Sequence, residues 1–201
     1  MELILLCGPQ AVGKMTVGLE LERKIEARLL YNHQTIDLFA RFLTYTPQTF
    51  HLSDAVRTDL FQQFVENEET NATKGIIFTV VISFGSETDW KVLENWVSIF
   101  TNANATVYFV ELEADINERI KRNTLEDRLA AKPSKRDIEF SHKELVTSNV
   151  RHRLNSDEGE VEARLPLVNY LRLNTTHLAA NETADLILNW LKKEGYSSFK
   201  A

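Results

Sequence analysis

The sequence has few of the features that mark secreted, membrane-spanning or disulfide-rich proteins. Its single cysteine, Cys7, excludes an intramolecular disulfide framework and favours a reducing compartment. The longest nearly apolar stretch, residues 76–84, is far shorter than the ~20 residues that cross a bilayer. No basic segment precedes the first apolar run, so we expect no signal peptide. These absences predict a cytoplasmic protein without a membrane partner.

The sequence also has fewer positively charged than negatively charged residues. The 201 residues include 23 Lys and Arg against 29 Asp and Glu, which gives a formal net charge of −6. An acidic protein repels polyanions, so we expect no nucleic-acid partner. The sequence has no internal repeat, no low-complexity tract and no long linker, and its length is typical of one domain. We therefore expect a single domain over residues 1–201, as a monomer or a homodimer.

The first residues of the chain carry its most informative pattern. Apolar residues 3–6 predict a buried strand, and the helical spacing of Val17, Leu21 and Ile25 predicts an amphipathic helix. The turn between them contains Gly-x-x-x-x-Gly-Lys and consists of Gly8, Pro9, Gln10, Ala11, Val12, Gly13, Lys14, Met15 and Thr16. Backbone N–H groups of such a turn converge on an anion, and Lys14 can reach the outer phosphates of a nucleotide. The turn therefore predicts an ATP site, with Lys14 also taking part in catalysis.

Strands and helices alternate along the rest of the sequence. Apolar and β-branched runs predict strands at residues 3–6, 27–32, 75–84, 106–112 and 169–174. Between them, capping residues predict helices that open at Ser53, Ser86, Asp115, Ser141 and Asn181. The helix at Ser53 has apolar side chains at four-residue spacing, namely Leu52, Val56, Leu60 and Phe64. This alternation predicts an α/β fold with a parallel sheet, whose ligands bind beyond the carboxyl ends of the strands.

After the predicted fourth strand comes the charged segment Asp115-Ile-Asn-Glu-Arg119-Ile-Lys-Arg122. With the phosphate-binding turn, it makes the chain resemble the P-loop small-molecule kinases, which include nucleoside monophosphate, shikimate and gluconate kinases and chloramphenicol phosphotransferase. In that family Asp-x-x-x-Arg-x-x-x-Arg opens a lid, and here the second arginine comes one residue early. The resemblance implies a three-layer P-loop NTPase fold with a five-stranded parallel sheet in the order 2-3-1-4-5. It also implies acceptor-site helices near residues 34–68 and a helical lid near residues 119–140.

The same resemblance implies roles for several polar residues. Arg119 would stack on the base, and Arg122 and Arg128 would clamp the phosphates, because a guanidinium can both stack flat and donate in pairs. Thr175, after the predicted fifth strand, would lie at the edge of the adenine. The alternative for the arginines is a solvated helix face that pairs with neighbouring glutamates.

The general base is the point at which the sequence departs from that family. Shikimate and chloramphenicol kinases resemble each other in having an aspartate near the end of the second strand. This chain has His33 there, and its nearest aspartate, Asp37, comes one helical turn later. A histidine can accept a proton at neutral pH, whereas Asp37 could serve as the base or merely favour the helix dipole. Arg41 and Arg57 are candidates for binding an anionic acceptor, although arginines on helix surfaces usually have no such role.

The sequence also departs from the usual motif at the residue that binds magnesium. Met15 follows Lys14, where Ser or Thr would place a hydroxyl on Mg²⁺. Either magnesium binding is impaired, or Thr16 supplies the hydroxyl as in the Gly-Lys-x-Thr version of nucleoside monophosphate kinases. In the second case water and phosphate would hold most of the ion, which Mg²⁺ tolerates. Glu87 and Asp89 are further candidates for its water network, but both also suit the start of a helix.

The sequence therefore predicts an ATP- and Mg²⁺-dependent phosphotransferase that moves the γ-phosphoryl group to a hydroxyl or phosphate of a small molecule. Two alternatives remain open: a nucleotide-binding regulator without transfer activity, and an antibiotic- or toxin-type kinase. No residue pattern selects the acceptor.

Overall fold

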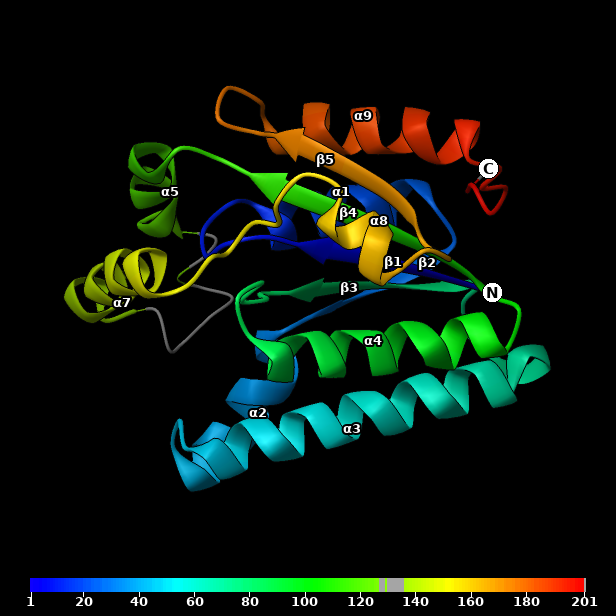
Figure 1. Cartoon of the computed structure of the whole chain (residues 1–201), viewed down its shortest axis with the longest axis horizontal. Coiled ribbons are helices and arrows are strands. Elements are labelled where there is room, and N and C mark those ends of the chain that lie inside the picture. Colours follow the sequence, from blue (N-terminus) through cyan, green and yellow to red (C-terminus); the bar gives the residue numbers. More distant parts are fainter. Residues whose placement is uncertain (127–128, 130–135, 201) are drawn as a thin grey trace.

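The computed structural model describes residues 1–126, 129 and 136–200. At its centre is a five-stranded sheet in the order β2-β3-β1-β4-β5, in which all neighbouring strands run parallel (Figure 1). The strands are Glu2–Cys7 (β1), Ala27–Tyr31 (β2), Gly75–Val80 (β3), Thr106–Glu113 (β4) and Asn169–Asn174 (β5). The predicted strand order and direction are confirmed.

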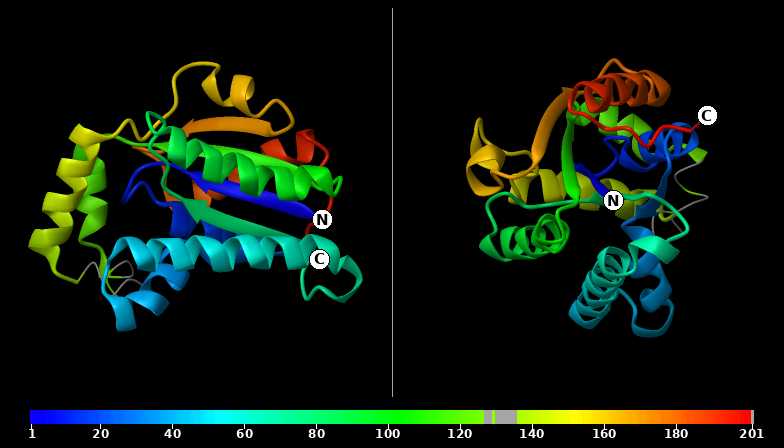
Figure 2. Two further views of the ribbon diagram at one scale, coloured as in Figure 1. Left: turned by 60° about the horizontal axis from the view of Figure 1, so that its bottom comes forward. Right: turned by 90° about the vertical axis from the view of Figure 1, so that its right-hand side faces the viewer.

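Helices cover both faces of this sheet, as Figures 1 and 2 show. Those described are Lys14–Lys24 (α1), His33–Leu43 (α2), Pro47–Glu66 (α3), Glu87–Asn102 (α4), Ile116–Asn123 (α5), Ile138–Arg151 (α7), Glu160–Arg164 (α8) and Ala180–Lys193 (α9), with a short 3₁₀ helix at Glu68–Thr70 (η1). Side chains of α1 and α9 pack on one face, and those of α3, α4 and α8 pack on the other. The fold therefore has three layers.

The strands are apolar throughout because successive side chains alternate between two buried faces. In β1, Leu3 and Leu5 pack in the cluster under α3 and α4, whereas Ile4 and Leu6 pack under α1 and α9. Cys7 is fully buried, and this burial raises the pKa of its thiol to about 12. The cysteine is therefore a small core residue without a reactive thiolate.

The structure corrects the predicted start and buried face of α3. This helix begins at Pro47, so the predicted cap Ser53 lies inside it and is buried. Its buried residues are Thr49, Ser53, Arg57, Phe61 and Phe64, one position away from most of the predicted apolar stripe. Leu52, Val56 and Leu60 are 38%, 42% and 43% exposed. Polar side chains occupy the inner face because they hydrogen-bond across to α2, as described below.

Other element boundaries differ by a few residues. Strand β3 ends at Val80, not at residue 84, because the chain turns away while Ile82 and Phe84 stay buried. The predicted cap Ser86 is confirmed, since its side chain accepts from the Asp89 N–H at 3.3 Å. Asp115 does flank α5, without a capping hydrogen bond from its side chain.

Two further predicted caps are wrong. Helix α7 begins at Ile138, where Asp137 accepts from the Phe140 N–H, and Ser141 is buried within the helix. Helix α9 begins at Ala180, one residue ahead of the predicted cap Asn181. In both cases the helix begins before the serine or asparagine that the pattern favoured.

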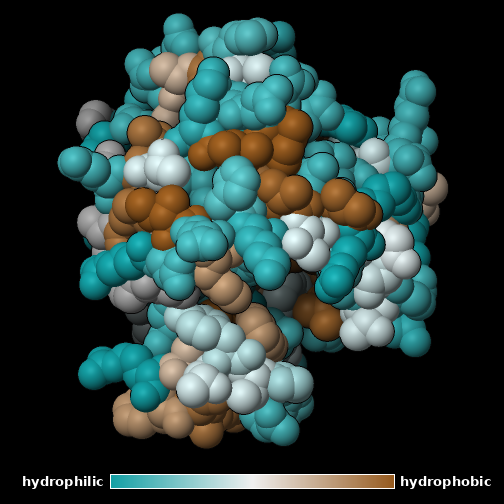
Figure 3. Space-filling view, turned by 90° about the vertical axis from the view of Figure 1, so that its left-hand side faces the viewer, coloured by the Kyte–Doolittle hydropathy of each residue, from teal (hydrophilic) through white to brown (hydrophobic). Residues whose placement is uncertain are grey.

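The carboxyl ends of all five strands point to one edge of the molecule, where α5 and α7 also lie (left in Figure 1). Figure 3 looks onto this edge, where apolar side chains reach the surface among hydrophilic ones. The predicted lid, residues 119–140, includes the end of α5 and the start of α7, but residues 127–128 and 130–135 lie outside the described part. The predicted phosphate-clamping residue Arg128 therefore lies outside the described residues. In the described ranges no helix combines the length and apolarity that a membrane span requires.

Candidate functional site

The turn between β1 and α1 has the tight backbone of a phosphate-binding loop. Gly8 has φ +138°, and a Cβ at this position would lie 2.2 Å from the Leu112 carbonyl oxygen. Gly13 has φ +109° and is the N-cap of α1, so the first N–H groups of the helix face the loop. Ala11 also has a positive φ, 61°. The loop therefore curls tightly around the helix N-terminus, the arrangement that favours an anion.

Lys14, the first residue of α1, folds back over this loop. Its Nζ donates to the carbonyl oxygens of Gly8 and Pro9 at 2.5 and 2.8 Å. The carbonyl groups of Gly8 and Pro9, two of the predicted loop residues, thus fix the position of the lysine side chain. The ammonium group is therefore bonded to the loop itself.

A cavity of about 370 Å³ opens over the loop. All predicted loop residues from Gln10 to Thr16 line it, and its opposite wall includes Arg122, Thr175 and Leu178. Thr175 is buried, and its hydroxyl lies within hydrogen-bond distance of the Val12 carbonyl oxygen at 3.3 Å. We call this space the nucleotide cavity, after the ligand that the sequence predicts for the loop.

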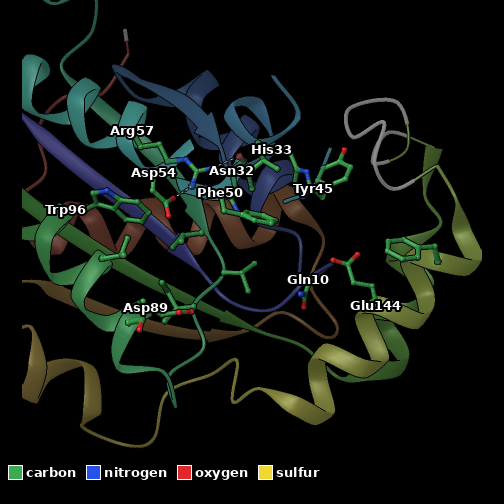
Figure 4. Close-up of a pocket in the computed structure, with 17 residues that line it drawn as sticks. Gln10, Asn32, His33, Tyr45, Phe50, Asp54, Arg57, Asp89, Trp96 and Glu144 are labelled. Atoms are coloured by element: carbon green, nitrogen blue, oxygen red, sulfur yellow. Dashed lines mark hydrogen bonds and ion pairs between the residues drawn. The ribbon is translucent and has the colours of Figure 1, made fainter. Parts of the chain in front are cut away.

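A second cavity, of about 460 Å³, adjoins the first (Figure 4). Its walls come from α2, α3, α4, α7 and the segment after β3. We call it the acceptor cavity, after the acceptor site that the resemblance implies at residues 34–68. Both cavities are lined by Gln10, Asn32, His33 and Val81. These four residues therefore form the place at which contents of the two cavities would meet.

His33 stands at this junction and is oriented by a carboxylate. Its Nδ1 lies 3.0 Å from Asp37 Oδ1, one helical turn further along α2. The Tyr45 hydroxyl donates to the same oxygen at 3.1 Å. The predicted candidates His33 and Asp37 therefore form one unit, in which the carboxylate holds Nδ1 and fixes the ring.

Arg57 is the centre of a buried polar cluster between α2 and α3. Its three nitrogens donate to Thr35 Oγ1 at 2.9 Å, Asp54 Oδ1 at 2.8 Å and the Asn32 carbonyl oxygen at 2.7 Å. The guanidinium carbon also lies 5.4 Å from the centre of the Phe78 ring. Burial lowers the pKa of Arg57 to about 10. The cluster fixes Asn32, and thereby the start of α2, beside the junction.

The two arginines of α5 have different surroundings. Arg119 is 3% exposed and lines neither cavity; its Nε donates to the Gln10 carbonyl oxygen at 2.8 Å and its Nη1 to Asn149 Oδ1 at 2.7 Å. Arg122 lines the nucleotide cavity instead, and its Nη2 donates to the Thr175 carbonyl oxygen at 2.7 Å. The arginine beside the far wall of the nucleotide cavity is thus Arg122, whereas Arg119 supports Gln10.

The magnesium candidates are divided between the two cavities. Thr16 is exposed in the first turn of α1 and lines the nucleotide cavity, whereas Met15 is largely buried. Asp89 lines the acceptor cavity, and Glu87 pairs with Arg164 at 2.9 Å. Among the described residues no three His, Cys, Asp or Glu side chains gather into a metal-binding group. One hydroxyl on the wall fits an ion that takes most of its ligands from phosphate and water.

Sequence reasoning missed several residues of the acceptor cavity. Phe50, Asp54, Trp96 and Phe140 line it from three different helices. Their spacing along the chain gives no signal, because only the packing of α3, α4 and α7 brings them together. Tyr45 lies in the short connection between α2 and α3, which carries no motif.

No protein-family model and no curated protein matches this sequence. Solved structures with a similar fold include shikimate kinase from Acinetobacter baumannii in complex with shikimate, with 15% identity, a TM-score of 0.54 and coverage of 97% of this chain and 95% of that one. The Deinococcus radiodurans tunicamycin resistance protein has 15% identity and a TM-score of 0.54, over 100% of this chain and 99% of that one. A sugar kinase from Janibacter sp. has 14% identity and a TM-score of 0.56, over 96% and 95%. The chain thus has the fold of the P-loop small-molecule kinases.

Proposed function

We propose that this chain is a phosphotransferase that moves the γ-phosphoryl group of ATP to a hydroxyl of a small molecule. One observation carries the proposal: the cavity over the phosphate-binding loop and the acceptor cavity share the wall formed by Gln10, Asn32, His33 and Val81. A γ-phosphate in the first cavity and a hydroxyl in the second would approach each other at this wall. Phosphoryl transfer needs chiefly such positioning and neutralisation of charge.

In this proposal each residue around the junction has a separate role. Lys14 and the loop N–H groups hold the β- and γ-phosphates, and Arg122 and Thr175 border the rest of the nucleotide. The acceptor oxygen bonds to the γ-phosphorus as the bond from that phosphorus to the β–γ bridging oxygen breaks, and ADP leaves. His33 Nε2 takes the hydroxyl proton while Asp37 stabilises the resulting imidazolium.

Magnesium supplies charge neutralisation on the phosphates when it is bound. Of the predicted residues, Thr16 is the one that would contribute a hydroxyl to its coordination or to its water shell. We place the enzyme in the cytoplasm as a single domain over residues 1–201, with residues 34–68 on the acceptor side and residues 119–140 as its lid.

Arg122→Ala is expected to weaken ATP binding by about ten- to a hundred-fold, since a hydrogen bond to a charged group is worth ~1.5–3 kcal/mol. The guanidinium joins α5 to the Thr175 carbonyl and, through Nη1, to the Val12 carbonyl at 3.2 Å. Calorimetric titration with a non-hydrolysable ATP analogue measures the change. Lys121→Ala, at a side chain that is 77% exposed, is the matched control. Unchanged affinity in Arg122→Ala would contradict a role of this arginine in nucleotide binding.

The proposal is tested with γ-labelled ATP and magnesium in a pooled metabolite extract. We expect a labelled product with the natural chain and none with Lys14→Ala, and the product then identifies the acceptor. Tight ATP binding without a labelled product in extracts that span sugars, amino alcohols and nucleosides would favour the nucleotide-binding regulator instead.

A further inference from the structure

At its junction with the nucleotide cavity, the acceptor cavity contains hydrogen-bond acceptors that lack a donor. Asn32 Oδ1 and Gln10 Oε1 are both buried atoms without a hydrogen-bond partner. Both residues line the acceptor cavity, and the amide nitrogen of Gln10 already donates to Ser148 Oγ at 3.0 Å. A buried acceptor without a donor is unfavourable, so these two oxygens favour a ligand that brings N–H or O–H groups.

Carboxylates add to this excess at another part of the cavity. Asp54 on α3, Asp89 on α4 and Glu144 on α7 line it, and Figure 4 shows the two aspartates on the opposite side of the view from Gln10 and Glu144. The two oxygens of Asp89 accept from the Ser83 N–H and the Ser86 hydroxyl, each at 2.9 Å. These donors are neutral, so in the described part of the chain no cation balances Asp89. Burial, and to a lesser degree the charge of Asp89, raises the pKa of Asp54.

The one guanidinium in the described wall of this cavity already donates its hydrogen bonds to other protein groups. Arg57 is 3% exposed and donates to Thr35, Asp54 and the Asn32 carbonyl. Asp54 balances its charge, so Arg57 and Asp54 together present no net positive charge to a ligand. A carboxylate or phosphate on the acceptor would face the remaining negative charge of Asp89 instead.

The space between these polar groups is apolar. Ile36, Phe50, Val80, Val92, Trp96 and Phe140 line it. The indole N–H of Trp96 already donates to Thr58 Oγ1 at 3.0 Å. The cavity therefore combines an apolar wall with two amide oxygens that lack donors and with carboxylates.

We propose that the acceptor cavity takes an amino alcohol with an apolar body. Its ammonium group lies toward Asp54 and Asp89, and its hydroxyl donates to Asn32 Oδ1 beside His33. The assignment of this hydroxyl as the phosphorylated group rests on the proposed function, whereas the charge preference of the cavity does not.

The test compares three probes that share a benzyl group and a hydroxyl but differ in charge. They are phenylalaninol, which is a cation, 3-phenylpropane-1,2-diol, which is neutral, and 3-phenyllactate, which is an anion. Their dissociation constants are measured by calorimetry on the whole chain with magnesium and a non-hydrolysable ATP analogue, so that no transfer is needed. We expect phenylalaninol to bind about tenfold tighter than the diol, because one close ion pair can contribute that much, and 3-phenyllactate to bind most weakly.

Asp89→Asn is expected to remove most of the preference for phenylalaninol, and Asp54→Asn to reduce it. Asp59→Asn, an exposed position on the same helix as Asp54, should leave it unchanged. Thermal melting of each variant identifies any loss of folding, and Asp89 and Asp54 provide two independent tests. Tightest binding of 3-phenyllactate, equal binding of the three probes, or no binding of phenylalaninol would each overturn the inference.

The two proposals can fail separately. If phenylalaninol binds with the expected preference but no labelled phosphate reaches any acceptor, the cavity assignment holds and the transferase assignment fails. If label reaches an anionic acceptor in preference to amino alcohols, the transferase assignment holds and the charge assignment fails.

Discussion

Lys14→Ala is expected to reduce phosphate transfer by about a hundred- to a thousand-fold, the usual cost of removing one donor from a charge-stabilising site. In the structure the Lys14 ammonium group is held at the mouth of the loop by the Gly8 and Pro9 carbonyls. A γ-phosphate in the nucleotide cavity would draw it forward, and its charge would then offset the charge that develops during transfer. Initial rates with γ-labelled ATP, measured as kcat and KM for ATP, give the effect.

The control for this prediction lies at the other end of the same helix. Lys24 ends α1 and pairs with Asp185 on α9, away from both cavities. Lys24→Ala removes the same charge from α1 but should leave kcat and KM for ATP nearly unchanged. Because Lys14 is only partly buried, Lys14→Ala should also melt close to the natural chain. Full transfer activity in Lys14→Ala would disprove the phosphate-loop assignment.

The phosphate-binding loop could be predicted from the sequence because all its parts are adjacent. The strand, the turn with Gly8 and Gly13, and the helix after it occupy residues 2–24. Backbone conformation at Gly8 depends on the missing Cβ, which is written in the sequence itself. The strand order is implied only by the resemblance to the P-loop small-molecule kinases, whereas the alternation of strands and helices predicts a parallel sheet.

The acceptor cavity could not be predicted in this way, because its polar residues are buried by partners far along the chain. The four-residue spacing of α3 indicated a helix but gave the wrong buried face. The inner face carries Ser53 and Arg57, which hydrogen-bond to Thr35 on α2. Sequence patterns treat such residues as exposed, since burial of a charge is favourable only when partners satisfy it.

Glu111, inside a strand, is another buried charged residue whose burial cannot be predicted from the sequence. It lies in the apolar run of β4 and is fully buried. Its carboxylate accepts from the Ser156 hydroxyl, the Asn155 amide and the Tyr170 hydroxyl. The run predicts the strand correctly, but these partners come from a loop and a strand more than forty residues later, so no local pattern reveals that the charge is satisfied.

His33→Gln is expected to lower kcat by about a hundred- to ten-thousand-fold, which is the range for loss of a general base. Glutamine keeps a polar side chain at the junction but cannot take the proton from the acceptor hydroxyl. ATP affinity should change little, because the phosphate loop and Arg122 are intact. His142→Gln, at an exposed histidine on α7, is the matched control and should leave kcat unchanged.

The pH dependence of kcat separates this role from a structural one. A base works only when it is deprotonated, so the rate of the natural chain should rise with pH through one transition. His33→Gln should lack that transition. Asp37→Asn should retain it but move it to lower pH, because the carboxylate 3.0 Å from Nδ1 favours the protonated imidazole and the amide does not.

The same two variants decide between the open candidates for the base. If Asp37 were the base, Asp37→Asn would lose most activity at every pH, while His33→Gln would keep a pH-dependent rate. If His33 is the base, the order of the two losses is reversed, and Tyr45→Phe, which removes the second donor to Asp37, should shift the transition only slightly upward. The upward direction follows because a carboxylate with one donor fewer attracts the imidazolium more strongly.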